Sequence, residues 1–205
     1  MAGIVVTFVL VHYLQEWSRM RERNRPNSGK VSKPIEDFSK YCRDIPDFPR
    51  KGVIFRDITN LLKNGPVFKR AIDEIANHYN KKKIDAIVSI EARGFIVGAA
   101  LAYHLGSGLV PVRKKGKLPW RVYKKTYNLE YGQDQLEVHQ DGIEPKQNIL
   151  IVDDVIATGG TVEAVAKLIK EMKGNIIGAA FLIELADLKG REKIKGIPVF
   201  SLIKY

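Results

Sequence analysis

The chain has 205 residues, 45% of them hydrophobic, and its 34 Lys and Arg residues against 23 Asp and Glu leave a formal net charge of +11. This composition fits one α/β domain with a sizeable core. The single cysteine, Cys42, excludes an intrachain disulfide, so a reducing, cytoplasmic compartment is expected. The basic residues are dispersed over several predicted elements, which favours a polyanionic substrate over nucleic acid or a membrane as the partner.

Residues 1–33 differ in composition from the rest of the chain. We expect them to form an extension, disordered or loosely attached, ahead of a domain that spans residues 34–205. The apolar stretch from Ile4 to Leu14 is shorter than the roughly 20 residues that a membrane-spanning helix needs. No basic region precedes that stretch, so a secretory signal is not expected either.

The domain begins with a turn region and a long helix. Residues 45–59 contain two prolines and a glycine, which is typical of a rigid extended segment and turn. Within it, Val53-Ile54-Phe55 is apolar enough to be buried. An amphipathic helix is predicted to begin at Pro66 and to end at a run of three lysines, which suits the helix dipole.

Five later segments are apolar runs rich in β-branched residues, typical of strands that are covered on both faces of a parallel sheet. Helices are predicted from Phe95 to His104 and from Val162 onward. Together these elements indicate an α/β fold with a five-stranded, mainly parallel sheet flanked by helices. The five predicted strands are Ile84–Ile90, Gly108–Val112, Ile149–Val152, Ile176–Ile183 and Ile197–Ile203.

A long connection separates the second and third of these strands. Residues 120–131 are polar and aromatic with weak periodicity, and residues 135–139 alternate like a returning strand. Connections of this length in compact domains are usually lids or disordered segments. We interpret this region as a long mobile hairpin.

Two adjacent carboxylates and a phosphate-sized loop follow the third apolar run. Asp153 and Asp154 stand at the carboxyl end of the predicted strand, where open α/β sheets bind ligands. The loop Ala157-Thr158-Gly159-Gly160-Thr161 allows backbone amides to converge at a helix N-terminus, which makes an anion site that needs no lysine. The missing lysine disfavours nucleoside-triphosphate hydrolysis by a P-loop. Carboxylates beside a phosphate site suit a sugar phosphate, because they accept hydrogen bonds from a vicinal diol.

Two further loops lie at the carboxyl ends of predicted strands. Glu91-Ala92-Arg93-Gly94 separates a strand from a helix, and Arg93 adds a planar guanidinium suited to phosphate. The cationic, glycine-jointed loop that contains Arg113, Lys114 and Lys117 suits a diphosphate.

The order of four apolar residues, Asp-Asp, three residues and Thr-Gly-Gly-Thr resembles the phosphoribosyl pyrophosphate (PRPP) signature of the type I phosphoribosyltransferase family. The resemblance implies that family's fold, with a small hood and a flexible hairpin lid. It implies that Asp153 and Asp154 hold the ribose, that the Ala157–Thr161 loop holds the phosphate, and that Mg²⁺ arrives with PRPP and has no direct protein ligand. The implied pyrophosphate-binding residues are Glu91, Ala92, Arg93, Gly94, Arg113, Lys114 and Lys117.

The run from Val53 to Arg56 and the C-terminal residues 200–205 resemble the adenine-specific branch of that family. The resemblance implies a homodimeric enzyme of purine salvage that converts adenine and PRPP into AMP and pyrophosphate. The residues expected at the adenine are Val53, Phe55 and Arg56. Glu130 is the expected acid–base catalyst and Tyr131 a lid residue, with Arg93, Asp153 and Asp154 as further catalytic groups.

Two alternatives stay open at this point. A phosphoribosyltransferase for hypoxanthine or guanine would share the PRPP-binding residues but would need a different base pocket. A non-enzymatic, PRPP-sensing regulator would need a DNA-reading module, and residues 1–33 show no capped helix pair that fits one.

Overall fold

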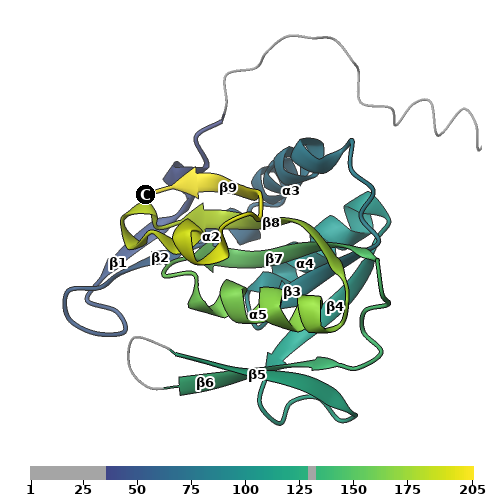
Figure 1. The fold of residues 1–205 in the computed structure, drawn as a ribbon. Helices are drawn as coiled ribbons and strands as arrows, with labels where there is room; N and C mark the ends of the chain where they lie inside the picture. Colours follow the sequence, from purple (N-terminus) through teal and green to yellow (C-terminus); the bar gives the residue numbers. More distant parts are fainter. Residues whose placement is uncertain (1–35, 129–132) are drawn as a thin grey trace, which may run out of the picture. The chain divides into compact units, whose positions relative to one another are not determined.

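The computed structural model describes residues 36–128 and 133–205, and Asp37–Tyr205 form one compact unit. Figure 1 shows this unit as a central sheet with helices packed on both faces. The predictions for the extension 1–33, for Glu130 and for Tyr131 lie outside the described residues. In the part of the chain that the structure covers, no helix is long and apolar enough to cross a membrane.

The central sheet contains the five predicted parallel strands and, in addition, an antiparallel hairpin at one edge. The prediction of a parallel α/β core is therefore confirmed. The hairpin pairs with the sheet through Arg113 and Lys114, which lie opposite Glu137 and Leu136. In spatial order, the strands are β5 (Val122–Asn128), β6 (Gln133–His139), β4 (Gly108–Lys114), β3 (Ala86–Ile90), β7 (Asn148–Ile156), β8 (Asn175–Glu184) and β9 (Val199–Lys204).

Strand β5 forms the first arm of the predicted hairpin, because residues 122–128 pair in regular register with β6, whereas the sequence pattern indicated a strand only for the returning arm, residues 135–139. Tyr123 and Tyr127 of β5 pack against the core, while Lys124 and Thr126 are exposed. The half-buried Lys125 occupies the inward-facing position between the two tyrosines. A lysine at that position hides the alternation of apolar and polar residues that would have predicted the strand.

Alternate residues of the central strand β7 face two separate cores. Leu150 and Val152 pack with the helices α3 (Gly65–Tyr79) and α4 (Gly94–Leu105). Ile149 and Ile151 pack with α5 (Gly160–Glu171) on the opposite face. All four side chains are fully buried. Burial on both faces explains why the strand is a continuous apolar run in the sequence.

Strand β7 also runs further than predicted. The apolar run predicts an end at Val152, before the acidic pair, but the strand continues to Ile156 and pairs with β8 through Asp153, Val155 and Ile156. Two carboxylates can occupy a buried strand because neighbouring groups compensate their charge. The acidic pair therefore lies on the sheet itself, and the phosphate loop begins immediately after the last strand residue.

A small two-stranded sheet, β1 (Arg43–Pro46) with β2 (Ile54–Asp57), forms the predicted hood. Burial of the Val53-Ile54-Phe55 run was predicted wrongly, since Ile54 is 51% exposed and its two neighbours are half-buried. Only two strands pair here, so one face of the run has no layer to cover it. The remaining elements are η1 (Phe38–Tyr41), α2 (Thr59–Lys63), η2 (Ala186–Leu188) and η3 (Gly190–Ile194).

Candidate active site

A cavity of about 470 Å³ opens at the carboxyl ends of β3, β4 and β7. These three strands are adjacent and parallel, so the residues that follow them meet at one edge of the sheet. The cavity brings together three groups of residues that are far apart in the sequence. Its lining comprises Ile90, Glu91, Ala92, Arg93, Lys114, Lys117, Tyr127, Leu136, Asp153, Asp154 and Thr161.

The acidic pair on β7 is buried and is partly neutralised by Arg93. The Nε atom of Arg93 forms an ion pair at 2.7 Å with Oδ2 of Asp154, whose side chain is 8% exposed. That oxygen has no well-aligned hydrogen-bond donor, so it retains acceptor capacity toward the cavity. Asp153 accepts a hydrogen bond from the backbone N–H of Asp154 at 2.9 Å. Burial raises the pKa of Asp153 well above its ordinary value, and the charge of Asp154 adds to that increase.

Gly94 allows the loop after β3 to approach this pair. A Cβ atom at position 94 would lie 2.6 Å from Oδ1 of Asp153 and 3.2 Å from its Cα atom. Any larger residue would therefore push the first turn of α4 away from β7. The peptide bond between Glu91 and Ala92 in the same loop is cis.

Glu91 holds two of the predicted pyrophosphate-binding cations. Its side chain is 4% exposed, and it accepts hydrogen bonds from Nε of Arg113 at 2.9 Å and from Nζ of Lys117 at 2.7 Å. Burial alone would raise the pKa of Glu91, but the bonds from Lys117 and Arg113 outweigh it, and the pKa lies below its ordinary value. The ionised carboxylate thus fixes Lys117 at the rim of the cavity and Arg113 next to it, outside the cavity lining.

Lys114 has a different partner, Asp134, which no motif in the sequence indicated. The Nζ atom of Lys114 lies 3.0 Å from Oδ2 of Asp134, and this hydrogen bond raises the pKa of the lysine. The Tyr127 hydroxyl donates to the same carboxylate at 3.5 Å and also reaches the side chain of Thr161. Asp134 stands in a polar strand, so only the pairing of β6 with β4 and β5 reveals its position.

The phosphate loop encloses a second, smaller cavity of about 80 Å³, which is lined by Asp153 and residues 155–162. Gly159 precedes α5 with a φ of 78°, in the left-handed region that favours glycine. No side chain caps the helix, so its first amides stay available to a ligand. The two cavities share Asp153 and Thr161 in their linings, so the phosphate loop and the cationic rim lie on neighbouring cavities.

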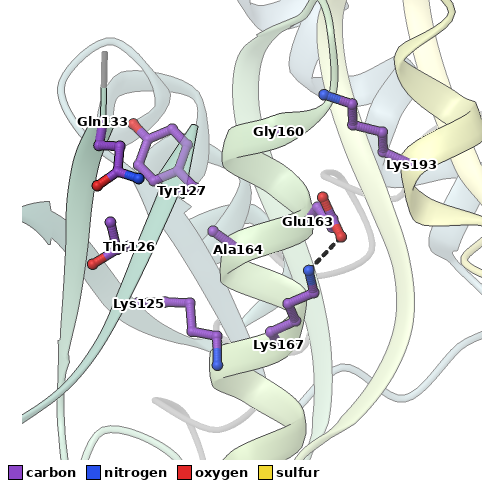
Figure 2. Close-up of a pocket in the computed structure, with 9 residues that line it drawn as sticks. All are labelled: Lys125, Thr126, Tyr127, Gln133, Gly160, Glu163, Ala164, Lys167 and Lys193. Atoms are coloured by element: carbon purple, nitrogen blue, oxygen red, sulfur yellow. Dashed lines mark hydrogen bonds and ion pairs between the residues drawn. The ribbon is translucent and has the colours of Figure 1, made fainter. Parts of the chain in front are cut away.

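A third cavity, of about 330 Å³, separates the hairpin from α5 (Figure 2). Lys125, Thr126 and Tyr127 of β5 line one wall, and residues of α5 line the other. In Figure 2, a dashed line joins Lys167 to Glu163 across one helical turn of α5. The hairpin and α5, the helix that begins at the phosphate loop, thus form opposite walls of this cavity, while Tyr123 and Tyr127 pack against the core to which α5 belongs.

Phe55 of the hood lies close to the cationic side of the site. Its ring centre is 4.8 Å from the guanidinium carbon of Arg93, and it makes an edge-to-face contact with Phe48. Arg56 lies next to it, but its side chain pairs with Asp44 and stacks over the ring of Tyr205 at 3.9 Å. Arg93 consequently touches both the acidic pair and Phe55, a contact between distant parts of the chain that spacing in the sequence could not show.

The backbone of Val53, another predicted adenine contact, is engaged within the hood. Its N–H donates to the carbonyl of Arg50, and its carbonyl accepts from the N–H of Phe48, both at 3.2 Å. Among the described residues, no group of three or more His, Cys, Asp or Glu side chains is arranged to hold a metal ion directly.

An acidic pair, a glycine-rich anion loop and a cationic rim at one edge of a parallel sheet define a phosphoribosyltransferase of type I. The sequence model of the phosphoribosyl transferase domain matches residues 58–204. The chain is 54% identical over 171 residues to an adenine phosphoribosyltransferase of Syntrophotalea carbinolica, covering 83% of this chain and all of that one. It is 53% identical to the enzyme of Thermotoga sp. strain RQ2, over 82% of this chain and 99% of the relative.

Solved structures of the same enzyme are similar. The adenine phosphoribosyltransferase of Thermoanaerobacter pseudethanolicus has a TM-score of 0.81 at 47% identity, over 84% of this chain and 100% of that one. The Saccharomyces cerevisiae enzyme, solved with adenine and an imino-altritol bisphosphate, has a TM-score of 0.76 at 41% identity, over 80% and 94% of the two chains. The chain belongs to the adenine phosphoribosyltransferase family.

Proposed function

We propose that this chain transfers the phosphoribosyl group of PRPP to N9 of adenine, releasing pyrophosphate and forming AMP. The observation that carries the proposal is the position of Arg93, which lines the cavity, pairs there with Asp154, and also contacts the ring of Phe55, the residue expected at the adenine. The size and polarity of this cavity suit a phosphorylated sugar beside a planar base. The adenine bound in the related yeast enzyme supports adenine as the base.

The cationic rim stabilises the leaving group in this proposal. Cleavage of the C1–pyrophosphate bond leaves negative charge on the diphosphate, and Arg93, Lys114 and Lys117 line the cavity where that charge would develop. Glu91 and Asp134 hold the two lysines in place before substrate arrives, so less reorganisation is needed during the reaction. Glu91 itself carries negative charge, and its contribution is to orient the cations.

The acidic pair acts on the ribose. Oδ2 of Asp154 is buried, lacks an aligned donor and can accept a hydrogen bond from a ribose hydroxyl. As the diphosphate departs, positive charge develops on the ring, and carboxylate charge at Asp153 and Asp154 stabilises it. Burial raises the pKa of Asp153 and so favours its protonated form, whereas positive charge on the nearby ribose ring would favour the carboxylate. The Ala157–Thr161 loop binds the 5′-phosphate through its backbone amides.

Mg²⁺ enters this proposal as a complex with PRPP. The cations that line the cavity would hold a diphosphate whose own oxygens and water bind the hard Mg²⁺ cation, so no residue of this chain needs to be a direct ligand. The bound metal would neutralise diphosphate charge. Removal of Mg²⁺ with EDTA should abolish AMP formation and leave the melting temperature unchanged, because no described cluster depends on a metal.

We assign the acid–base role to Glu130, which lies outside the described residues. N9 of adenine becomes nucleophilic when a proton on the imidazole ring is shed or shifted, and a carboxylate beside N7 can accept it. General acid–base groups contribute about 10²–10⁴-fold, so Glu130→Leu should lower kcat on that scale with near-wild-type affinity for PRPP. The exposed Glu171 of α5 offers a matched control, Glu171→Leu. An effect on KM for adenine alone would make Glu130 a binding contact.

Helix α4 supports the proposal of a homodimer. The helix exposes apolar side chains along one face, with Ile96 44% and Tyr103 93% exposed, and Leu109 on the adjacent strand is 42% exposed. A contiguous apolar face of this kind is typical of an interaction surface. Light scattering would detect the dimer, and Tyr103→Glu should shift it toward monomer.

A cytoplasmic location and a dispensable N-terminal extension complete the proposal. The half-buried Cys42 is a free thiol, as expected of a protein from a reducing compartment. Cell fractionation tests the location. Relatives align over their whole length with about four-fifths of this chain, which supports a separate extension at residues 1–33. Its deletion should leave activity and melting temperature nearly unchanged.

One assay tests the central proposal. AMP formation from PRPP should be observed with adenine, and turnover with hypoxanthine or guanine should be far lower, because the hood would have to pair with a different purine edge. Comparable turnover with all three bases would contradict adenine specificity. Absence of any pyrophosphate release with all three bases would contradict the reaction itself.

A further inference from the structure

The segment after β8, residues 185–191, which includes η2 and the start of η3, contributes no residue to the reaction described above. It nevertheless begins beside the phosphate loop, because the N–H of Leu185 donates to the carbonyl of Ile156 at 3.0 Å, directly before that loop. Figure 2 shows Lys193 of η3 extending toward Gly160, at the N-terminus of α5. This segment and the phosphate loop are therefore spatial neighbours.

Gly190 touches the phosphate loop backbone to backbone. A Cβ atom on Gly190 would lie 2.2 Å from the carbonyl oxygen of Ala157 and 3.1 Å from the amide nitrogen of Gly159. In the reverse direction, a Cβ atom on Gly159 would lie 2.2 Å from the carbonyl oxygen of Gly190. Gly190, unlike Gly159, does not have a positive φ. A glycine is therefore needed at position 190 because there is no room for a side chain, and not because of the backbone conformation.

This contact is made from outside the loop. The loop cavity is lined by Asp153 and residues 155–162, and Gly190 is not among the lining residues. A loop of small residues has few side chains of its own with which to hold its amides in one orientation. Support from a neighbouring segment is the way in which such a site becomes rigid.

Arg191 fixes Gly190 in this position. Its Nε and Nη2 atoms donate to the two carboxylate oxygens of Glu184 at 2.5 and 2.6 Å, and Nη1 donates to the carbonyl of Val199 at 3.0 Å. The hydrogen bonds from Arg191 hold the pKa of Glu184 below its ordinary value. Glu184 is 7% exposed and lies opposite Ile156 in the pairing of β8 with β7. A bidentate pair therefore links Gly190 to the strand position where the phosphate loop starts.

We infer that Gly190, held by the Arg191–Glu184 pair, is a positioning residue that supports the phosphate loop and thereby sets affinity for the 5′-phosphate of PRPP. This inference rests on the proposed function for the identity of the ligand. The contact itself does not depend on the base, so its loss should weaken phosphate-bearing ligands and leave adenine recognition unchanged. Small displacements of a binding group can change rates by about 10²-fold.

Gly190→Ala is the most direct test, because it adds one methyl group against the loop. We expect the KM for PRPP and the Kd for ribose 5-phosphate to rise about 10- to 100-fold, with a smaller change in kcat and an unchanged KM for adenine. Arg191→Lys keeps the charge but cannot make the bidentate contact, so it should change the same constants in the same direction by less.

Gly178→Ala is the matched control. Gly178 lies on β8 and is also crowded, since its Cβ atom would lie 3.1 Å from the Tyr79 ring, but its neighbours do not include the phosphate loop. This variant should lose thermal stability and keep wild-type affinity for ribose 5-phosphate. If Gly190→Ala does not fold, Arg191→Lys decides the question by the same measurements.

Two results would overturn the inference. One is wild-type affinity for ribose 5-phosphate in folded Gly190→Ala or Arg191→Lys protein. The other is an equal loss of affinity in Gly178→Ala, which would indicate a general effect of reduced stability. Calorimetry with ribose 5-phosphate needs no turnover, so it tests the support of the loop even if the wild-type protein forms no AMP and the proposed function fails.

Discussion

The two anion-binding regions of this protein are built in opposite ways. The loop at Ala157–Thr161 offers backbone amides, and its shape depends on glycines and on the backbone of Gly190. The cationic rim offers the side chains of Arg93, from the loop after β3, and of Lys114 and Lys117, from the end of β4 and the loop after it, and all three are oriented by carboxylates. A backbone site is disturbed by added volume, whereas a side-chain site is disturbed by a change in charge.

This difference matches the ligand proposed for each region. In the proposed reaction the 5′-phosphate remains bound throughout, so a rigid loop of fixed dipoles suits it. The diphosphate gains negative charge as it leaves, and side chains with full positive charge stabilise that change more strongly. Arg113, Lys114 and Lys117 are each at least one-third exposed, which leaves them room to adjust to the departing group.

Gly159→Val should produce the largest effect. The new side chain would collide with the carbonyl of Gly190, at a residue whose φ is 78°. We expect kcat/KM for PRPP to fall by about 10²-fold or more, because the loop amides must move. Gly196→Val is the control, since Gly196 has a similar φ of 85° with open space around it. Equal activity in the two variants would contradict a volume-sensitive loop.

Glu91→Gln should have an intermediate effect on the cationic rim. The substitution keeps the size of the side chain but removes the charge that orients Arg113 and Lys117. We expect kcat to fall about 10-fold through lost preorganisation, with less than about a threefold change in the KM for PRPP. Asp73→Asn removes a remote acid that pairs with Lys69 and His104, and it should leave kcat unchanged. Tighter PRPP binding with unchanged kcat would mean that Glu91 only repels the diphosphate.

The smallest expected effect is on the pH dependence of folding stability. We consider only the part of that dependence that comes from Glu91. Its folded-state pKa lies below the ordinary value of about 4.3, so the stabilisation is fully present above that value and is lost as pH falls through the lower, folded-state pKa. The melting temperatures of wild type and Glu91→Gln should therefore differ by a constant amount from about pH 5 to about pH 8 and converge at more acidic pH. Convergence near neutral pH would contradict the assignment.

Local signals in the sequence were sufficient for the parallel core and for the PRPP motif. The runs that became β3, β7 and β8 are apolar over most of their length because they are buried on both faces, so their burial is visible in the sequence as a continuous apolar pattern. Asp153-Asp154 and the Gly159-Gly160 loop are close together in the chain, so their residue types and spacing are enough to indicate a sugar-phosphate site. The assignment of individual residues to substrates remains a prediction.

Contacts between distant segments were decided by the tertiary structure alone. The hairpin strand β5 carries Lys125 at an inward position, which only a neighbouring cavity allows. Asp134 becomes the partner of Lys114 through the pairing of β6 with its two neighbours. The sequence around Lys125 and Asp134 does not indicate the role of either residue, because that role depends on the groups that lie opposite it in the folded structure.

Composition, periodicity and one motif determined the fold class, the order of the buried strands along the chain and the place of the phosphate loop, since each depends on residues that are close in the sequence. The structure decided that Arg93 lies between Asp154 and Phe55, that Glu91 orients Arg113 and Lys117, and that β7 continues through its acidic pair. These features depend on charged side chains that come from separate elements. The interaction energies between those charges depend on the distances and on the exclusion of water, and both are set only by the packing of the folded chain.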